Sequence, residues 1–551
     1  MKHQLIKEHK INSLAEVIEG AAKRYGNRSA YSIVLPNGSN ATLNYTEVNE
    51  HSNNLAVYLK EALKLKSHDV VAIMCPNTLS YPVAAFGVLK AGLILTNVNP
   101  LYTDSELIHQ LKDSHAKVLI IIDLFGDKVE RVVKQTHVEH VIHVSLADFM
   151  PFIQQRLLRF ALKHLKKQIP PLNFESVAID KALHRGASIR RKYSIDTRSY
   201  RSDVSPEDTA IYQYTGGTTG VSKGAELTHQ SLDYGTAMIN TVLRTELDSE
   251  IAETILLVLP MYHAYAFTVG TLLSPQNGFH SVLCPSPRPI SNLKPAFDKY
   301  DISFLPGINT LYQALLAEEW FVRNPPKHLK ISTGGGSATL VSTAEKWLEL
   351  TGIKIVEAYG MTEALPITIG PVDGNHQIGS IGYPVGGIEV RLVDDEGNDV
   401  ADGSAGEVIV RGPQVMKGYL NRPKATAETI VDGWLHTGDI AVKQNDGFYK
   451  IVDRKKEMII VSGFNVYPSE IEALINQIDG ITECACIGVP DSKTGEAIKI
   501  VLAKDKPTVD EKTVIEFSRK HLTGYKIPKY VEFMDELPKS PVGKILKKEL
   551  R

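Results

Sequence analysis

The segment from Tyr214 to Gly224, Tyr-Thr-Gly-Gly-Thr-Thr-Gly-Val-Ser-Lys-Gly, has the composition of a phosphate-binding loop. Its glycines let backbone N–H groups approach a phosphate closely, its hydroxyls add donors, and Lys223 adds positive charge. A Walker A loop has Ser or Thr directly after its lysine, whereas Gly224 follows Lys223 here, which argues against an ordinary P-loop kinase or ATPase. A flexible glycine loop is the alternative, and it does not explain this density of hydroxyls.

Two further segments could complete a nucleotide site. The run Gly334-Gly335-Gly336 follows a predicted strand and exposes flat backbone on which a planar base could rest, although a turn is equally typical of it. The segment Tyr359-Gly-Met-Thr-Glu363 offers an aromatic ring for stacking, a hydroxyl, and a carboxylate that could hold Mg²⁺ beside phosphates. Each segment is weak evidence when it is taken alone.

The hydrophobic patterns around these segments predict an α/β protein, because strands alternate with helices. The first 150 residues have helical patterns at 13–25, 45–59 and 81–89 and strand patterns at 70–74, 93–98 and 118–122. Short strands follow at 256–259, 281–284, 302–305, 329–332 and 354–357. Alternation with turns at 379–411 predicts a small β subdomain, and we expect a domain boundary at 449–455. The last block has helices at 468–477 and 512–521 and strands at 484–489 and 498–503.

The composition is that of a globular protein without an obvious polyanionic partner. Of 551 residues, 43% are hydrophobic, and Lys plus Arg (61) nearly balances Asp plus Glu (63), so no nucleic-acid partner is expected. The four cysteines form no C-x-x-C pair, and Cys484 and Cys486 fit alternate positions of a strand better than a zinc site. The start lacks the apolar core of a signal peptide, and no apolar run approaches the ~20 residues of a membrane span. We therefore expect a cytoplasmic protein, soluble or peripheral to a membrane.

Residues 149–170 form an amphipathic pattern without any acidic residue. On a helical wheel, one arc is apolar and the other is basic. The apolar arc contains Ile153, Leu157, Leu158, Ala161, Leu162 and Leu165, and the basic arc contains Arg156, Arg159, Lys163, Lys166 and Lys167. The pattern is typical of a helix that lies on anionic lipid. A surface helix that packs on the core and leaves its lysines in water is the alternative, and the pattern does not separate the two.

Taken together and in this order, the three site segments make the chain resemble the adenylate-forming superfamily of acyl-CoA synthetases, luciferases and peptide-synthetase adenylation domains. The resemblance covers essentially the whole chain. The segment Asp432-Gly-Trp-Leu-His-Thr-Gly-Asp439 with Asp453-Arg-Lys-Lys456 looks like the fatty acyl-CoA synthetase motif. Three further segments resemble those of bacterial long-chain fatty acid–CoA ligases. They are Asn97-Val-Asn-Pro-Leu-Tyr-Thr, Gly307-Ile-Asn-Thr-Leu and Val461-Ser-Gly-Phe-Asn-Val-Tyr-Pro.

The resemblance implies both a fold and a reaction. The fold is α/β, with an N-terminal domain at 1–452 that contains two α/β subdomains and a small β subdomain, and a small, mobile α+β domain at 453–551. In the reaction, a carboxylate attacks the α-phosphate of MgATP, and the thiol of coenzyme A then displaces AMP from the acyl-adenylate. The implied activity is ATP-dependent activation of long-chain fatty acids, with ATP, Mg²⁺ and coenzyme A. The protein forms no covalent intermediate, so it acts by positioning and charge stabilisation.

The resemblance also implies a role for each matching residue of the nucleotide site. The phosphate loop would cradle the β- and γ-phosphates through Thr215, Gly216, Gly217, Thr218, Thr219, Gly220 and Lys223. Thr215 and Glu363 match the magnesium positions. The adenine site would consist of Gly334, Gly335, Gly336 and Tyr359, with Gly360 and Met361 in the same motif, and Thr362 would reach the α-phosphate. Asp439 would accept hydrogen bonds from the ribose hydroxyls, and Arg454 would assist at the ribose or the phosphates.

Further assignments concern the acid, the adenylation lysine and the second half-reaction. His263 is placed near the substrate carboxylate, with a structural histidine as the alternative. Lys544 matches the adenylation lysine, for which a solvated tail lysine is the alternative. Asp453 matches the hinge that would bring Lys544 to the site first and the coenzyme A loop Ser462-Gly463-Phe464 second. The acyl chain would occupy a tunnel near 262–268 and 307–310.

Two other functions stay open at this point. One is an adenylate former for aryl or medium-chain acids or for carrier-protein loading, and the other is a non-catalytic acyl- or nucleotide-binding protein at a membrane. The motif at 432–456 disfavours the first, and Lys544, Glu363 and Asp439 disfavour the second. Because each buried CH₂ contributes ~0.8 kcal/mol, long-chain acids reside in lipid, which favours contact of 149–170 with the inner face of the membrane. Chain-length preference and oligomeric state stay open, with a homodimer as one option.

Overall fold

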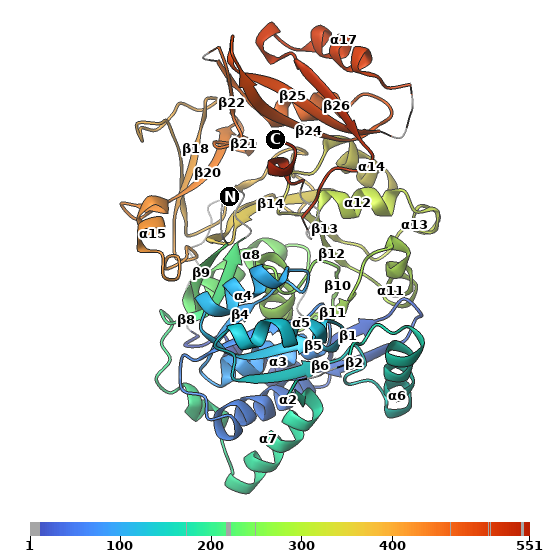
Figure 1. Ribbon diagram of the computed structural model, residues 1–551, viewed down its shortest axis with the longest axis vertical. Coiled ribbons are helices and arrows are strands. Elements are labelled where there is room, and N and C mark those ends of the chain that lie inside the picture. The colour runs from blue at the N-terminus through green and yellow to red at the C-terminus, as the bar shows by residue number, and fades with distance from the viewer. Residues whose placement is uncertain are drawn as a thin grey trace.

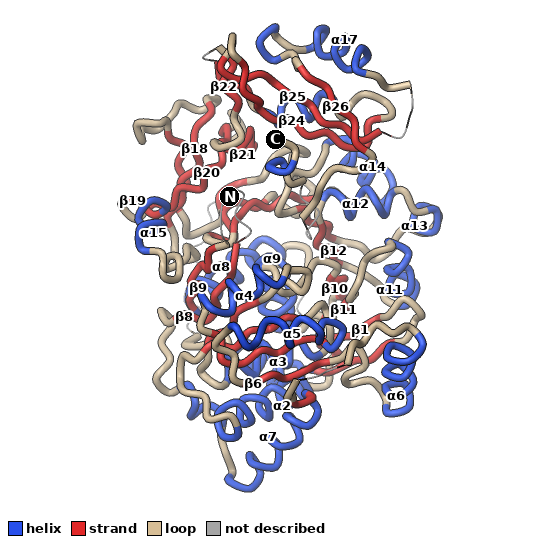
Figure 2. Tube along the Cα trace, viewed as in Figure 1, coloured by secondary structure: helices blue, strands red, loops and turns tan. Residues whose placement is uncertain are grey.

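The computed structural model describes residues 11–171, 174–215, 222–247, 250–462, 464–504, 506, 508–540 and 545–551. These residues form two large α/β sheets, a smaller β-sheet, and a C-terminal sheet with its own helices (Figure 1). Helices lie against the sheets throughout the molecule (Figure 2). The predicted fold class, a large N-terminal α/β domain with a small C-terminal domain, is therefore confirmed.

The first α/β sheet is built on strands that are buried on both faces. Its inner strand β5 has the sequence AKVLIII, and a continuous apolar run such as VLIII is typical of a parallel strand that is covered on both faces. The pairs are parallel except for β8–β9, an antiparallel hairpin that places Thr215 opposite Lys223. In spatial order the sheet contains β7 (Val177–Ala178), β6 (His140–Val144), β5 (Ala116–Ile122), β3 (Val70–Met74), β4 (Ile94–Asn97), β8 (Thr209–Thr215) and β9 (Lys223–Thr228).

The second α/β sheet carries the glycine run and the Tyr359–Glu363 segment. Toward one edge of this sheet, β14 pairs with β15 in the antiparallel direction, and Met361 lies opposite Ala364. Thr362 and Glu363 therefore occupy a tight turn at the edge of the sheet. In spatial order the sheet contains β16 (Tyr383–Pro384), β15 (Ala364–Ile369), β14 (Ile355–Met361), β13 (Ile331–Gly334), β12 (Phe304–Gly307), β10 (Thr254–Leu257), β11 (His280–Leu283), β1 (Ser29–Val34) and β2 (Asn40–Asn44).

The two α/β sheets share one hydrophobic core, which holds their helices in place. Buried residues of both sheets, such as Ile120 and Leu257, belong to the same cluster. Capping boxes at Asn44, Thr103 and Thr228 start α2, α4 and α8. The helices of this domain are α1 (Ala15–Tyr25), α2 (Tyr45–Val57), α3 (Ser80–Lys90), α4 (Asp104–Asp113), α5 (Gly126–Val132), α6 (Phe152–Phe160), α7 (Ile179–Tyr193), α8 (His229–Leu243), α9 (Ala264–Ala266), α10 (Ser274–Asn277), α11 (Lys294–Lys299), α12 (Asn309–Leu316), α13 (Glu319–Arg323) and α14 (Val341–Thr351).

The smaller β-sheet extends well beyond the segment at 379–411 that the pattern predicts. Its strands β19, β20 and β21 come from 430–454, where glycine and charged residues interrupt the alternation. All its pairs are antiparallel, and α15 (Pro423–Thr429) lies beside it. The sheet contains β17 (Glu389–Val393), β18 (Ala405–Arg411), β20 (Trp434–Lys443) and β19 (Ile430–Val431), with β21 (Tyr449–Arg454) paired to β20.

The C-terminal sheet has a hydrophobic core of its own, which includes Ile471, Ile500 and Leu502. Cys484 and Cys486 occupy alternate positions of β24, as expected, and both are buried free thiols. Helices α16 (Pro468–Ile475) and α17 (Glu511–His521) accompany the sheet. Its strands are β23 (Phe464–Val466), β22 (Ile459–Val461), β25 (Gly495–Lys504), β24 (Ile481–Asp491) and β26 (Tyr530–Met534).

The amphipathic segment differs from its predicted form. Helix α6 covers only Phe152–Phe160 and continues as a π-helical segment at Ala161–Leu165, so a single regular wheel over 149–170 is wrong. Arg159 faces the protein, where its Nη2 lies 2.7 Å from Oδ1 of the buried Asp148. Leu162 is buried, whereas Ile153, Leu157 and Leu165 of the same predicted arc are exposed. Within the described part of the chain, no helix is long and apolar enough to cross a membrane.

Candidate active site

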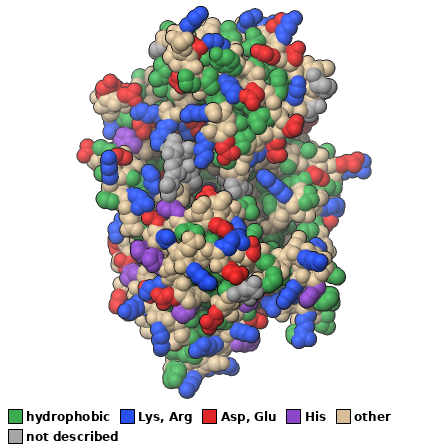
Figure 3. Space-filling view, in the orientation of Figure 1, with side chains coloured by type: hydrophobic (Ala, Val, Ile, Leu, Met, Phe, Trp, Pro, Cys, Tyr) green, Lys and Arg blue, Asp and Glu red, His purple; other side chains and the backbone are tan. Residues whose placement is uncertain are grey.

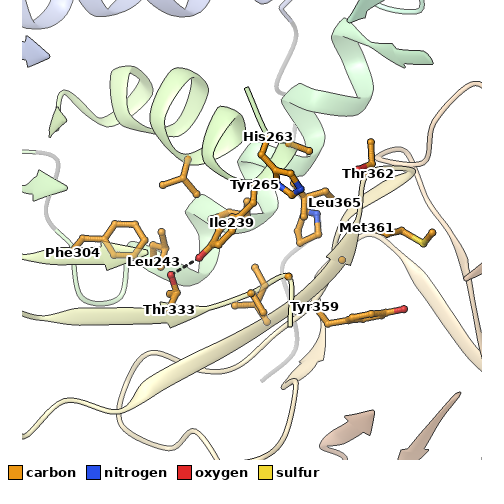
Figure 4. Close-up of a pocket in the computed structure, with 18 residues that line it drawn as sticks. Ile239, Leu243, His263, Tyr265, Phe304, Thr333, Tyr359, Met361, Thr362 and Leu365 are labelled. Carbon is orange, nitrogen blue, oxygen red and sulfur yellow. Dashed lines mark hydrogen bonds between the residues drawn. The ribbon is translucent and has the colours of Figure 1, made fainter. Parts of the chain in front are cut away.

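A largely apolar cavity lies between α8, the segment at 263–269 and the second α/β sheet. Its volume is about 70 Å³. Figure 4 shows His263 and Thr362 toward one end and Phe304 and Leu243 at the other, with Tyr359 pointing away from Phe304. The cavity therefore connects a deep apolar region with the predicted nucleotide motifs. Its described lining is Ile239, Leu243, His263, Ala264, Tyr265, Val269, Phe304, Thr333, Gly335, Gly336, Ala358, Tyr359, Gly360, Met361, Thr362, Leu365, Pro366 and Ile369.

The position of this cavity differs in part from the tunnel expected from the sequence. His263 to Tyr265 line it, as predicted, but no residue of 307–310 is among the described residues that do. The ring of Tyr312 occupies the space above Gly307, and its hydroxyl donates to the carbonyls of Leu305 and Thr333. The second wall is instead supplied by α8 and β15.

His263 faces the cavity from the N-terminal end of α9. Burial lowers the pKa of its imidazole, so the ring is neutral near pH 7. Among the residues that the structure describes, none hydrogen-bonds to this ring. Beside it, the Tyr265 hydroxyl lies 2.7 Å from Thr333 Oγ1 and fixes the aromatic wall. A neutral, unpaired imidazole at the mouth can exchange a hydrogen bond with a bound acid.

Asp439 joins the small β-sheet to the predicted adenine tyrosine. The Tyr359 hydroxyl donates to Asp439 Oδ2 over 2.7 Å, and Arg454 Nε lies 3.1 Å from Asp439 Oδ1. Arg454 is adjacent because β20 and β21 pair Asp439 with Arg454. The Asp439 carboxylate is buried, whereas the Arg454 side chain is 42% exposed. The structure thus brings three predicted ribose and adenine residues into direct contact.

The glycine run forms a narrow edge after β13. A side chain at Gly335 would approach the Tyr265 ring within 3.2 Å, and Gly336 has a φ of +77° with open space around it. Glu357 supports the loop after this run, because its Oε2 accepts a hydrogen bond from the Thr339 N–H over 3.2 Å. Burial raises the pKa of Glu357 to about 7, partly offset by backbone hydrogen bonds from Thr339 and Gly379. Gly334 packs against Thr339 as well: a Cβ atom added at Gly334 would lie only 2.6 Å from Thr339 Oγ1.

Helix α4 contacts both ends of the predicted phosphate loop. Gly216, Gly217, Thr218, Thr219 and Gly220 lie outside the described residues. At the stem, the Tyr214 hydroxyl donates to Asp113 Oδ2 of α4 over 2.8 Å, and His109 Nε2 lies 2.9 Å from the Ser222 carbonyl. Thr215 and Lys223 stand opposite each other where the loop begins and ends.

Glu363 and Lys223 are both in contact with Tyr419, a residue outside the predicted motifs. The Tyr419 hydroxyl donates to Glu363 Oε1 over 2.6 Å, and Lys223 Nζ lies 4.6 Å from the centre of the Tyr419 ring. Glu363 is buried, and this bond leaves its second oxygen, Oε2, for another partner. The predicted metal and phosphate residues are therefore linked through one side chain.

The C-terminal domain contributes no described residue to the cavity lining. Asp453 is buried at the end of β21, and its carboxylate accepts from the Ser469 N–H of α16 over 2.8 Å and from the Arg454 N–H over 2.7 Å. It therefore ties the small β-sheet to the first helix of the C-terminal domain. Figure 3 shows a hollow in this face, between the C-terminal domain at the top and the body beneath it.

Two predicted residues of the C-terminal domain, Lys544 and Gly463, lie outside the described residues. Near Gly463, Ser462 has a φ of +52°, and Phe464 is exposed and stacks on Tyr525 with ring centres 4.7 Å apart. Near Lys544, Lys547 lies 2.8 Å from Glu472 and 3.2 Å from Glu457. Lys547 is thus an anchor of the C-terminal segment, not a solvated tail lysine.

The family of the chain follows from comparison with known proteins. The family model described as AMP-binding enzyme matches residues 18–420, and that of the AMP-binding enzyme C-terminal domain matches residues 470–544. Two proteins called long-chain-fatty-acid–CoA ligase, from Escherichia coli O157:H7 and Salmonella typhimurium, are 43% and 44% identical over 548 residues. The alignment covers 99% of this chain and 95% of each of them.

A solved structure supports the same assignment. ATP-bound MatB from Rhodopseudomonas palustris is 26% identical and superposes with a TM-score of 0.82 over 98% of both chains. Two domains of this fold, with a cavity that opens beside nucleotide motifs, define an enzyme that activates acids through an adenylate. The chain belongs to the AMP-binding enzyme family, and the resemblance stated from its motifs is confirmed.

Proposed function

We propose that this chain is an ATP-dependent long-chain fatty acid–CoA ligase that releases AMP and pyrophosphate. The observation that carries the proposal is the apolar cavity that runs from Thr362 and His263 to Phe304. The deep end is lined by apolar side chains, which suit an apolar tail, and the acid group would then lie beside the nucleotide motifs. Relatives that carry this name are 43–44% identical over nearly the whole chain, which supports the same substrate class.

In the first half-reaction, a carboxylate oxygen of the acid attacks the α-phosphorus of ATP, and the bond to pyrophosphate breaks. We assign His263 to holding the carboxylate and Thr362 to the α-phosphate. Lys544 balances the charge that moves between them, because a flexible point charge suits that task. Asp439, Tyr359 and Arg454 hold the ribose and adenine, with Gly334–Gly336, Gly360 and Met361 beside the base. The phosphate loop, from Thr215 to Lys223, holds the β- and γ-phosphates.

The residues present fit a magnesium ion that arrives with ATP. Glu363 Oε2 and the Thr215 hydroxyl are hard oxygen donors, and Mg²⁺ bound to phosphates needs only one or two protein ligands. Within the described residues, no cluster of three or more His, Cys, Asp or Glu side chains could hold an ion by itself. When bound, the ion would neutralise charge on the phosphates.

In the second half-reaction, the sulfur of coenzyme A attacks the carbonyl carbon of the acyl-adenylate, and AMP leaves. We propose that the domain at 453–551 rotates about Asp453 between the two steps and presents Lys544 first and the 462–464 loop second. The Asp453 carboxylate accepts hydrogen bonds from the N–H groups of Ser469 and Arg454, which supports a hinge at this residue. Because glycine has no side chain, we assign Gly463 to the pantetheine arm.

We also propose that α6 contacts anionic lipid at the inner face of the membrane. Large apolar side chains are exposed on it, among them Ile153 (72%) and Leu157 (65%), together with Phe152, Phe160 and Leu165. Exposed basic residues belong to the same segment, 152–167, namely Arg156, Lys163, Lys166 and Lys167. Green and blue side chains meet at this corner in Figure 3, where Figure 1 places α6. The apolar groups would enter the lipid, and each basic residue would add ~1 kcal/mol of attraction to it.

Acids of graded length test the substrate class. The purified chain is incubated with MgATP and saturated fatty acids of increasing length, and pyrophosphate is measured before and after coenzyme A is added. We expect the specificity constant kcat/KM to rise with chain length and acyl-CoA to form only when coenzyme A is present. A preference for aryl or medium-chain acids would support the alternative adenylate former, and binding without turnover would support a non-catalytic protein.

A further inference from the structure

Tyr419 lies between the two charged groups at the phosphate end of the site. Its hydroxyl donates to Glu363 Oε1 over 2.6 Å, and its ring faces Lys223 Nζ at 4.6 Å from the ring centre. Tyr419 and Glu363 are 8% and 6% exposed, so their hydrogen bond is shielded from water. One neutral side chain therefore touches both the acidic and the basic member of this region.

The backbone around Tyr419 fixes this arrangement. The Met416 N–H donates to the Glu363 carbonyl over 2.7 Å, and the Leu420 N–H donates to the Gly224 carbonyl over 2.8 Å. Lys417 and Gly418 exchange two further backbone hydrogen bonds with Glu226, each 2.9 Å long. The segment 416–420 thus connects the turn after β14 with strand β9, so the phenol is held relative to both.

The chemistry of the contact is that of a charge-assisted hydrogen bond beside a cation. A phenol bound to a buried carboxylate orients it and occupies one of its two oxygens. Burial, with the Glu363 charge beside it, raises the pKa of Tyr419 far above its ordinary value, so the hydroxyl keeps its proton near neutral pH. The face of the ring attracts the Lys223 ammonium group.

We propose that Tyr419 is a positioning residue for the phosphate end of the site. Its hydroxyl orients Glu363, which leaves Oε2 as the oxygen for the metal, and its ring sets the position of Lys223. The inference rests on the proposed function, which assigns Glu363 to the metal and Lys223 to the phosphates.

The test compares Tyr419→Phe with Tyr200→Phe. The control removes the same kind of bond, because the Tyr200 hydroxyl donates to Glu61 Oε1 over 2.9 Å outside the site. Mn²⁺ is titrated into each protein with ATP and without acid, and free Mn²⁺ is measured by electron paramagnetic resonance. We expect Tyr419→Phe to weaken Mn²⁺ binding by about tenfold or more, as loss of a hydrogen bond to a charged group does, and Tyr200→Phe to bind like the wild type.

Two kinetic readouts separate positioning from a general structural role. In Tyr419→Phe, half-maximal pyrophosphate formation should need more free Mg²⁺, while thioester formation from supplied acyl-adenylate and coenzyme A stays within about twofold of the wild type. Tyr419→Leu, which also removes the ring, should additionally weaken ATP binding.

Wild-type Mn²⁺ affinity in Tyr419→Phe would overturn the inference, and so would equal losses in both half-reactions together with a lower Tm. A wild-type chain that forms no pyrophosphate with any acid would instead overturn the proposed function. The Mn²⁺ titration still decides the role of Tyr419 in that case, because it needs no turnover.

Discussion

The ribose and adenine contacts show how single residues are prepared before a ligand arrives. Both oxygens of Asp439 have partners, Tyr359 and Arg454, which come from different sheets. A buried carboxylate is stable only when it is paired or hydrogen-bonded. Asp439 is therefore oriented in advance, and the ribose hydroxyls that it is proposed to bind would meet a fixed acceptor.

Glu357 gives the glycine loop a pH-dependent support. Because burial raises its pKa from 4.5 to about 7, the folded chain keeps a proton between these pH values that the unfolded chain releases. The free energy of unfolding therefore falls by about 3 kcal/mol as the pH rises from about 4.5 to 7. In Glu357→Gln this contribution is absent, so we expect the variant to have the higher Tm at pH 8 and a flatter profile below pH 7.

Thermal unfolding between pH 4.5 and 8 measures this difference. Glu345→Gln is the matched control, because Glu345 is an exposed carboxylate on α14 and should leave the profile unchanged. Parallel Tm profiles for wild type and Glu357→Gln would show that Glu357 does not titrate in this range.

At the scale of elements, the predicted strands and helices are most accurate where burial is greatest. Strand β3 is found at its predicted bounds, because a run such as Val70–Met74, buried on both faces, has few alternatives. Strand β20 was not predicted, because His436, Gly438 and Asp439 break its alternation. Its ladders to β18 and β21 supply the stability that its own sequence lacks.

Helix α6 shows that amphipathic spacing does not determine which side of a helix faces the protein. The wheel places Arg159 with the other basic residues, but its ion pair with Asp148 turns it inward. The widening into a π-helical segment at Ala161 then shifts the residues that follow. Neither the ion pair nor the widening has a local sequence signal.

The proposed membrane contact of α6 and the π-helical segment after it predicts loss of lipid binding upon charge reversal. Replacement of Arg156, Lys163 and Lys166 by Glu should abolish co-sedimentation with vesicles that contain anionic lipid, because the attraction becomes repulsion. The matched control is the same reversal at Lys512, Arg519 and Lys520 of α17, which are also exposed. Unchanged binding of the α6 variant, or equal loss in the α17 variant, would exclude α6 as the contact.

At the scale of the whole molecule, local motifs named residues that the structure brings close together, but not the contacts that join them. His263, Tyr359 and Thr362 line one cavity, and Asp439 accepts a hydrogen bond from Tyr359. Tyr419 was missed because its partner Glu363 is 56 positions away in the sequence and only the folded chain brings them together. Glu357 was missed because the sequence does not show that this strand residue is buried. Only the folded chain shows the loop that its carboxyl group supports.

The proposed rotation of the C-terminal domain predicts complementary defects. Lys544→Ala should reduce acyl-adenylate formation by at least ~10²-fold, as loss of a charge-stabilising group does, and keep thioester formation from supplied acyl-adenylate. Gly463→Leu should keep pyrophosphate release and block thioester formation. Lys548→Ala, at an exposed lysine of the same segment, is the control for the first variant. Equal damage to both half-reactions in either variant would contradict the alternation.

The central claim is that an acyl-adenylate connects the two half-reactions, and the fate of the carboxylate oxygen tests it most directly. Palmitate labelled with ¹⁸O in its carboxylate is incubated with the purified chain, MgATP and coenzyme A, and the nucleotide products are analysed by mass spectrometry. Attack on the α-phosphorus predicts AMP that carries one ¹⁸O atom, together with unlabelled pyrophosphate. Unlabelled AMP, or ¹⁸O in inorganic phosphate with ADP as the nucleotide product, would contradict it.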